Sequence, residues 1–395
     1  MNDRDQPSGG ATLEVRTFIE QHADRLKNNG LLRSEHIERA FRRVARHRFI
    51  ERFWIYGPDG YREFRNNPSD PSSECLPTIY SGQVLITQLR DGAVTSSSSE
   101  SRLVAAMLEL LEVRPGHRVL EIGTGSGYNA ALLAEIVGSS GSVATLEYQH
   151  DVAEQAQRLL REAGYQAVHV LERDGFYGAA EWAPYDRIIV TAGSVEPAPA
   201  WMDQLSEGGF LLVPLRHAAA NPLGRLSIAE GKTLHGRFVG FSGFMAIEGE
   251  LASATYYPPL AAPVKDPVRE EPLWPELRGQ SVSWWSSPRA GFWFFLGLND
   301  PRTRVIGWPD VFGLVDATGA GVTVGREAIV VHGDTSAADD LEQLYHEWVA
   351  LQRPALTDYT VRFEPLPTRT PPSANPTSWT THGRYYRRVV RLEPR

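Results

Sequence analysis

The sequence predicts an α/β protein with a doubly wound, mainly parallel sheet, helices before it and a smaller α+β region after it. Three observations predict this fold. Short β-rich runs alternate with helical patterns between residues 118 and 215, as they do when crossover helices join parallel strands. A glycine-rich turn connects the first of these runs to the helix that follows. A proline-rich stretch at 257–275 then separates this part from the C-terminal region, and seven of the ten tryptophans lie after residue 270.

Length and composition bound the class of protein. A chain of 395 residues suits about two domains, and 42% hydrophobic with 22% charged residues is a globular balance. The net charge of -8 argues against nucleic-acid binding. The only cysteine, Cys75, excludes an internal disulfide and a cysteine-rich zinc site, and the histidine spacing predicts no metal site. The polar N-terminus and the lack of a long apolar run predict neither signal peptide nor membrane contact, hence a cytoplasmic protein.

The elements follow from spacing and turn residues. Residues 1–11 are expected to form a disordered tail, 12–53 and 100–115 helices with a break at Asn29-Gly30, and 57–77 a polar loop. Strands are expected at Arg118–Ile122, Ser142–Glu147, Ala167–Leu171, Tyr185–Thr191 and Phe210–Pro214. Helices are expected at Tyr128–Val137, His150–Ala163 and Ala198–Leu205. Two alternating runs, Gly224–Glu230 and Leu234–Phe241, are expected to add an antiparallel edge.

The C-terminal region is predicted to be a separate α+β domain. Its expected strands are Ser281–Trp285, Phe292–Leu298, Arg304–Ile306, Phe312–Asp316, Ala328–His332 and Asp358–Phe363, and its expected helix is Ser336–Gln352. The aromatic residues are interpreted as its core, with some rings at an interface with the first domain or a peptide. The basic stretch 383–395 is interpreted as a solvated strand edge, with attraction of an acidic peptide as the alternative. The predicted limits are 1–11 for the tail, 12–255 for the first domain (12–115 a helical cover, 116–255 the core), 256–276 for the linker and 277–395 for the second domain.

The strongest chemical signal is the run VLEIGTGSGY at 119–128. Its glycines let a ligand approach the backbone, and the turn presents main-chain N–H groups at the start of a helix. Glu147 ends the next predicted strand, where a carboxylate can accept hydrogen bonds from ribose hydroxyls. Two cofactor classes fit: residues 125–130 satisfy the dinucleotide pattern G-x-G-x-x-[G/A], and 121–127 satisfy the E-x-G-x-G-x-G form of S-adenosylmethionine (SAM) methyltransferases. The neighbouring segments favour SAM over NAD.

Those segments resemble the protein-L-isoaspartate O-methyltransferase family. The similar segments are AFRRVARHRF (40–49), VAAMLELL (104–111), PGHRVLEIGTGSGY (115–128), Asp174-Gly175, PYDRIIVTA (184–192) and LSEGG (205–209). They occur in the family's order and cover residues ~35–215. The resemblance implies a Rossmann-like SAM methyltransferase domain that methylates a carboxylate of an aspartyl or isoaspartyl residue and releases S-adenosyl-L-homocysteine.

The resemblance also implies roles for individual residues. The glycines of the loop would hold the methionine part of SAM, Glu121 would orient the loop, Glu147 would bind the ribose, and Asp174 with Gly175 would flank the adenine. The complete expected cofactor set is Glu121, Gly123, Thr124, Gly125, Gly127, Tyr128, Glu147, Tyr148, Asp174 and Gly175. The fold would place this set at one edge of the parallel sheet.

A serine-rich segment is expected to contact the acceptor. The family's segment Thr-Ile-Ser-x-Pro supplies a hydroxyl there, and its serine aligns with Ser99. The threonine, isoleucine and proline are replaced in this chain, so Ser98 and Ser97 stay as alternative catalytic residues. A flexible polar loop with no role in the reaction is the competing interpretation.

The expected chemistry needs few reactive side chains. A carboxylate is already ionised at pH 7, so methyl transfer needs no general base and depends on positioning and water exclusion. No G-x-S-x-G run indicates acyl transfer, and His47 and His169 are interpreted as structural. The substrate is expected to be a peptide or protein, with no nucleic acid or membrane partner, while the oligomeric state is left open.

The added length suggests a narrower substrate. Residues after 255 resemble the extensions of family members that tailor ribosomally made lanthipeptides and graspetides. In these the ester of a modified precursor peptide cyclises to a succinimide or yields isoaspartate. General repair of isoaspartyl proteins is the close alternative, and a non-catalytic SAM-domain protein that binds a peptide is the alternative of a different class.

Overall fold

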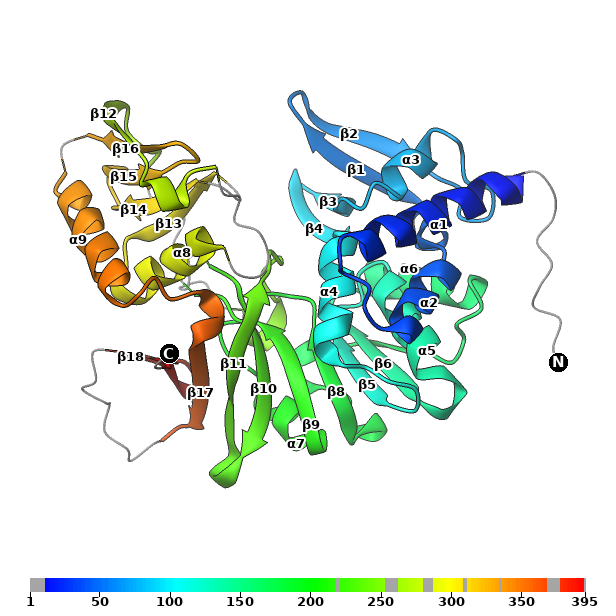
Figure 1. Cartoon of the computed structure of the whole chain (residues 1–395). Coiled ribbons are helices and arrows are strands. Elements are labelled where there is room, and N and C mark those ends of the chain that lie inside the picture. The colour runs from blue at the N-terminus through cyan, green and yellow to red at the C-terminus, as the bar shows by residue number, and fades with distance from the viewer. Residues whose placement is uncertain are drawn as a thin grey trace. The chain divides into compact units, whose positions relative to one another are not determined.

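The computed structural model describes residues 11–217, 220–252, 262–279, 287–307, 311–333, 335–367 and 377–393. The chain divides into two compact units, 1–191 with 203–209, and 192–202 with 210–395 (Figure 1). Helix α7 (Pro199–Asp203) and strand β9 (Leu205–Pro214) have residues in both units. The domain limits predicted from the sequence, at 255 and 277, divide the chain differently from these two units. They stay a prediction. The predicted tail falls, up to residue 10, outside the described residues.

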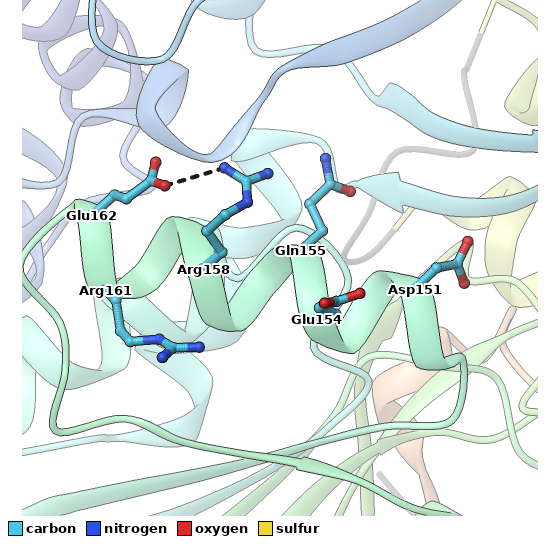
Figure 2. Close-up of a pocket in the computed structure, with 6 residues that line it drawn as sticks. All are labelled: Asp151, Glu154, Gln155, Arg158, Arg161 and Glu162. Carbon is cyan, nitrogen blue, oxygen red and sulfur yellow. Dashed lines mark hydrogen bonds and ion pairs between the residues drawn. The ribbon is translucent and has the colours of Figure 1, made fainter.

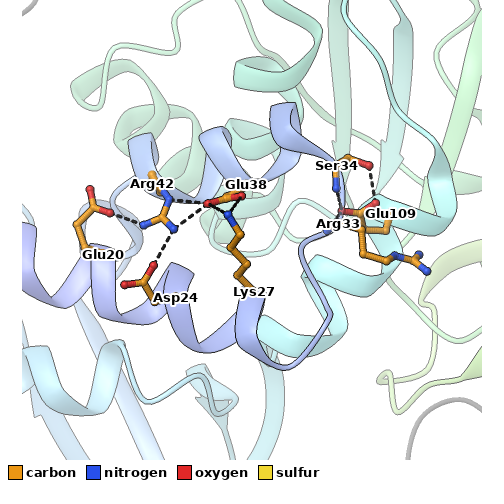
Figure 3. Close-up of polar contacts among 8 residues, drawn as sticks. All are labelled: Glu20, Asp24, Lys27, Arg33, Ser34, Glu38, Arg42 and Glu109. Carbon is orange, nitrogen blue, oxygen red and sulfur yellow. Dashed lines mark hydrogen bonds and ion pairs between the residues drawn. The ribbon is translucent and has the colours of Figure 1, made fainter.

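The first unit begins with the predicted helices. They are α1 (Ala11–Asn28), α2 (Glu35–Arg43) and the 3₁₀ helix η1 (Arg46–Phe49). Gly30, with a φ of +71°, follows the end of α1 and confirms the predicted break. Arg42 of α2 binds Glu20 and Asp24 of α1 as well as its own neighbour Glu38 (Figure 3). These contacts join α2 to α1.

An antiparallel sheet with the order β2-β1-β3-β4 follows. Its strands are β1 (Arg52–Gly57), β2 (Gly60–Arg65), β3 (Leu85–Arg90) and β4 (Ala93–Ser98), with helix α3 (Cys75–Ile79) between the two hairpins. The predicted loop at 57–77 is therefore wrong in part. Of strand β2 only Phe64 is buried, so its sequence shows mostly polar residues and little apolar alternation.

The parallel sheet of the first unit has the order β8-β5-β6-β7. Its strands are β5 (Arg118–Ile122), β6 (Ser142–Glu147), β7 (His169–Glu172) and β8 (Tyr185–Val190), and its helices are α4 (Ser101–Leu111), α5 (Tyr128–Val137) and α6 (His150–Glu162). Ile122 pairs with Leu146 at the carboxyl ends of β5 and β6. The glycine loop after β5 and Glu147 at the end of β6 therefore lie at the same edge, where α/β sheets bind ligands.

The second unit contains an antiparallel group with the order β18-β19-β17-β11-β10-β9. The strands besides β9 are β10 (Pro222–Ala229), β11 (Thr233–Phe241), β17 (Tyr359–Pro365), β18 (Ser378–His382) and β19 (Tyr386–Leu392). The predicted antiparallel edge, β10 with β11, is confirmed. The interpretation of 383–395 as a solvated edge is wrong, because β19 lies between β17 and β18. Arg387 and Arg388 are buried there, and Arg387 pairs with Glu364.

A five-stranded sheet with the order β12-β16-β15-β14-β13 completes the second unit. Its strands are β12 (Pro267–Pro272), β13 (Thr303–Gly307), β14 (Val311–Val315), β15 (Gly321–Val324) and β16 (Ala328–His332), with helices α8 (Pro288–Asn299) and α9 (Ala337–Ala350). Strand β12 lies inside the predicted linker, and β15 was not predicted. The expected strand Ser281–Trp285 lies outside the described residues.

The aromatic run at 292–295 forms part of helix α8, so the strand predicted at 292–298 is wrong. All four side chains are at most 2% exposed. Trp293 stacks on Phe312 at 5.1 Å between ring centroids, while Phe294 contacts Tyr359. A helix buried on every side carries no polar face, so its sequence lacks the helical period. These rings form the core of the second unit.

Candidate active site

The loop after β5 requires glycine at three alternate positions. Gly123, Gly125 and Gly127 have φ values of +99°, +53° and +82°, a region that side chains disfavour. A Cβ on Gly123 would lie 2.5 Å from the Thr191 hydroxyl, which donates to the main-chain oxygens of residues 122 and 123. A Cβ on Gly127 would lie 3.2 Å from Leu160. The three glycines therefore let the turn at the start of α5 pack closely against its neighbours; we call this turn the cradle.

Glu121 lies fully buried beneath this loop. One carboxylate oxygen accepts from Asn129 Nδ2 at 2.7 Å, and the other accepts from Thr145 Oγ1 at 2.6 Å. Thr145 in turn lies 2.7 Å from the hydroxyl of Thr124, within the loop. Burial raises the pKa of Glu121 to about 7, against the two hydrogen bonds that lower it. Glu121 thus connects the loop, β6 and α5 through hydrogen bonds.

Glu147 reaches the same loop from the end of β6. It is 8% exposed, and its carboxylate accepts from Gly125 N at 3.0 Å and from Gln149 N at 3.1 Å. Asp174 accepts from Phe176 N at 2.9 Å and so begins a short 3₁₀ helix. A Cβ on Gly175 would lie 2.5 Å from Ile122 Cγ2. The structure therefore brings the loop, Glu147 and Gly175 together around the end of β5.

The two tyrosines of the expected cofactor set lie in different surroundings. Tyr128 is 3% exposed and contacts Phe41 and Phe49, so its ring packs against the N-terminal helices. Tyr148 is 51% exposed. Tyr128 thus belongs to the packing between α5 and the N-terminal helices, while Tyr148 is open to solvent beside Glu147.

The serine segment forms strand β4 up to Ser98 and pairs with β3. The flexible-loop interpretation is therefore wrong for these residues. Ser98 is buried, whereas Ser97 and Ser99 are half-buried. A Cβ on Gly125 would lie 3.2 Å from the main-chain oxygen of Ser97. This contact places the segment directly against the glycine loop.

Arg46 was not singled out from the sequence, yet it holds the same segment. It is 0% exposed and donates to the main-chain oxygens of Ser99 at 2.8 Å, Ser98 at 3.3 Å and Ile79 at 2.9 Å. Burial lowers the pKa of its guanidinium to about 10. Arginines in a helical pattern are normally assigned to the surface, so only its place in the segment 40–49 could have indicated it.

Two histidines and a surface hollow lie outside this arrangement. Burial lowers the pKa of His47 to about 4, and its Nδ1 lies 2.8 Å from the hydroxyl of Tyr80. His169 stacks on Trp182 at 3.5 Å. Figure 2 shows the hollow on α6, lined by polar and charged side chains such as Asp151. None of the expected site residues lines it.

Among the residues that the structure describes, no group of three or more His, Cys, Asp or Glu side chains could hold a metal ion. In the same part of the chain, no helix is long and apolar enough to cross a membrane.

A family of known proteins is similar to this chain over residues that include the glycine loop. The sequence model described as "Protein-L-isoaspartate(D-aspartate) O-methyltransferase (PCMT)" matches residues 76–238. The protein-L-isoaspartate O-methyltransferase of Pyrococcus horikoshii is 40% identical over 190 residues, 48% of this chain and 74% of the relative. That of Methanopyrus kandleri is 35% identical over 232 residues, 58% and 91% of the two chains. The chain belongs to the protein-L-isoaspartate O-methyltransferase family. As a member, it is a SAM-dependent methyltransferase with a Rossmann-like fold.

A solved protein-L-isoaspartate O-methyltransferase structure is similar over more than the family's core. It aligns with 87% of this chain and 96% of its own length, with a TM-score of 0.52 and 25% identity. A match of that extent must include most of the residues after 238. The isoaspartate O-methyltransferase family therefore contains at least one structure with a counterpart to much of the C-terminal extension. The extension alone does not distinguish this chain within the family.

Proposed function

We propose that the chain methylates the free carboxylate of an aspartyl or isoaspartyl residue in a peptide, which is the side-chain carboxylate of aspartate and the α-carboxylate of isoaspartate. The observation that carries this proposal is the close approach of the Ser97 carbonyl to Gly125, where it lies 3.2 Å from the position that a Cβ would take. It joins the segment expected at the acceptor to the loop expected at the methionine part of SAM. The cradle of Gly123, Gly125 and Gly127 would hold that group, because glycines leave the backbone free of side chains where a ligand must approach the start of a helix. Glu147 would bind the ribose.

The reaction is a displacement at carbon. SAM supplies a methyl group bonded to a sulfonium sulfur. A carboxylate oxygen of the peptide attacks this carbon, the carbon–sulfur bond breaks with its electron pair on sulfur, and a methyl ester forms beside S-adenosylhomocysteine. The carboxylate is ionised near neutral pH, so the chain needs no base and acts by orientation. Arg46, through the carbonyls of Ser98 and Ser99, holds the acceptor segment.

The ester explains the later product without another active site. The main-chain nitrogen of the residue after the ester attacks the ester carbonyl carbon and loses its proton, and methanol leaves. A succinimide results, which water opens to aspartate or isoaspartate. Methoxide can leave in this step, whereas an ionised carboxylate is a poor electrophile.

Within this activity we propose a modified, ribosomally made precursor peptide of the lanthipeptide or graspetide type as substrate. The serine run in place of the family's Thr-Ile-Ser-x-Pro supports a changed acceptor site. Repair of isoaspartyl residues in general is the second candidate. The solved family structure that matches 87% of the chain favours repair, because it shows that the extra length is shared.

Two peptides separate the candidates. A generic isoaspartyl peptide and a modified precursor with an unmodified aspartate are each incubated with enzyme and SAM, and methyl ester and methanol are measured. Preference for the precursor supports tailoring, and efficient turnover of the generic peptide supports repair. Methylation of neither would contradict the proposed activity.

The role of Ser99 is tested in the same assay. Ser99→Ala should lower turnover by about tenfold, the effect of one lost hydrogen bond, with the S-adenosylhomocysteine affinity unchanged. Ser139→Ala, at an exposed serine of the same unit, is the control. Unchanged turnover in the Ser99 variant would transfer the role to Ser98 or Ser97.

A further inference from the structure

Gln149 occupies the N-cap position of α6 but does not cap the helix. Its main-chain N–H donates to Glu147 at 3.1 Å, and its side-chain Nε2 donates to the main-chain oxygen of Thr95 at 2.8 Å. N-cap positions favour Ser, Thr, Asp and Asn, whose short side chains bind the first turn. The longer glutamine side chain instead reaches strand β4. One residue therefore contacts both the carboxylate expected at the ribose and the strand expected at the acceptor.

The rest of the β3–β4 hairpin is held at the same place. The Thr95 hydroxyl donates to Gln88 Oε1 at 2.6 Å, and Gln88 Nε2 donates to Asp151 at 2.6 Å. Arg90 forms an ion pair with Asp151, also at 2.6 Å. Both strands of the hairpin are thus bonded to residues 149–151. Two positions after Thr95, the Ser97 carbonyl lies against Gly125.

The second polar atom of the Gln149 amide is still available. Its Oε1 is buried and has no hydrogen-bond partner. Leaving such an acceptor unpaired is unfavourable, and an orphaned buried acceptor in a folded protein needs an explanation. This unpaired oxygen belongs to the residue two positions after Glu147. A bound group with hydroxyl donors at Glu147 would explain why the oxygen has no partner in the chain. This is an observation independent of the bond to Thr95.

We propose that Gln149 is a positioning residue that couples cofactor binding at Glu147 to the placement of acceptor strand β4. The proposal rests on the proposed function for the identity of the cofactor and the acceptor. A ligand that orders Glu147 and the Gln149 main chain also orders the side chain that holds Thr95. Coupling of this kind is reciprocal, so a bound peptide at β4 would strengthen cofactor binding by the same factor.

Hydrogen–deuterium exchange of the full chain with S-adenosylhomocysteine tests the coupling directly. The variant is Gln149→Met, which keeps the length and the apolar stem but has no amide. In the wild type, S-adenosylhomocysteine should slow exchange both in the loop at 123–127 and in β4. In Gln149→Met the protection of β4 should be lost while that of the loop stays. Gln157→Met, at an exposed glutamine of the same helix, should behave as wild type.

Kinetics provide a second readout. Gln149→Met should raise the KM for the peptide by about tenfold, the effect of one lost hydrogen bond, with a smaller change in the dissociation constant of S-adenosylhomocysteine. Equal protection of β4 in wild type and variant, or equal loss at β4 and the loop, would overturn the coupling. Absence of protection anywhere in the wild type would contradict the proposed function itself, and the coupling with it.

Discussion

Replacing Glu121 by glutamine should change how the stability of the protein depends on pH. The carboxylate is fully buried, and burial raises its pKa to about 7. Glutamine has the same shape and no charge, so it imitates the protonated form. Its amide can donate to Thr145, whose hydroxyl can then donate to Thr124 at the present distance of 2.7 Å. The hydrogen bonds that link residue 121, Thr145 and Thr124 are therefore kept, with donor and acceptor exchanged between residue 121 and Thr145.

The magnitude follows from proton linkage. In the unfolded chain the Glu121 carboxyl has its ordinary pKa of 4.5, so the folded state, with a pKa of about 7, binds the proton more tightly. The stability that comes from this proton is complete below pH 4.5 and is lost as the pH rises through 7. Each pH unit between the two values corresponds to about 1.4 kcal/mol, so the loss is about 3 kcal/mol.

Urea unfolding of wild type and Glu121→Gln between pH 4.5 and 8.5 measures this loss. The free energy of unfolding of the variant, relative to wild type, should rise by about 3 kcal/mol across the range. Glu154→Gln, at an exposed residue of α6, is the control and should follow the wild-type profile. Parallel profiles for wild type and Glu121→Gln would refute the claim that a buried, proton-binding carboxylate lies beneath the loop.

Three further substitutions test separate contacts. Gly125→Ala adds a Cβ 3.2 Å from the Ser97 carbonyl at a φ of +53°. The affinity for S-adenosylhomocysteine, measured by calorimetry, should fall about tenfold or more. An unchanged dissociation constant would contradict the proposal that the cradle holds the cofactor. Arg46→Lys leaves one ammonium group where a guanidinium now binds several main-chain carbonyls. The free energy of unfolding should fall by about 2 kcal/mol. A change below about 0.5 kcal/mol would show that these hydrogen bonds contribute little to stability. Gly383→Ala places a Cβ 2.2 Å from the Glu196 carboxylate, which accepts hydrogen bonds from the main-chain N–H groups of residues 384–386. The free energy of unfolding in urea should fall by about 2 kcal/mol. Wild-type stability in this variant would contradict the importance of these bonds.

The parallel sheet and its loop could be predicted because local sequence determines them. Strand β5 and the start of α5 have the predicted bounds, since an apolar run ends at glycines that only a tight strand–helix turn needs. The position of Glu147 beside the glycine loop follows from the same reasoning, because neighbouring parallel strands end at the same edge of the sheet. The glycine loop and its carboxylates were therefore the most predictable part of the site.

The rest depends on packing that local patterns do not carry. Helix α8 was predicted as a strand because it is apolar on all sides. Strand β19 was predicted at the surface because arginines are usually exposed, whereas Arg387 and Arg388 are buried and Arg387 pairs with the half-buried Glu364. Arg46 and Gln149 act through main-chain oxygens of Ser99 and Thr95, 53 and 54 residues away in sequence. No spacing rule relates such pairs, so the structure is needed to identify these contacts.

The most direct test of the central claim uses SAM carrying an isotopic label in its methyl group, with an aspartyl or isoaspartyl peptide as acceptor. The account predicts label on the peptide as a base-labile ester, released as methanol when the succinimide forms. Glu147→Ala should remove the signal at limiting SAM, because the carboxylate that is proposed to bind the ribose is lost. Label that resists base, or no label on either peptide with SAM bound, would contradict carboxyl methylation.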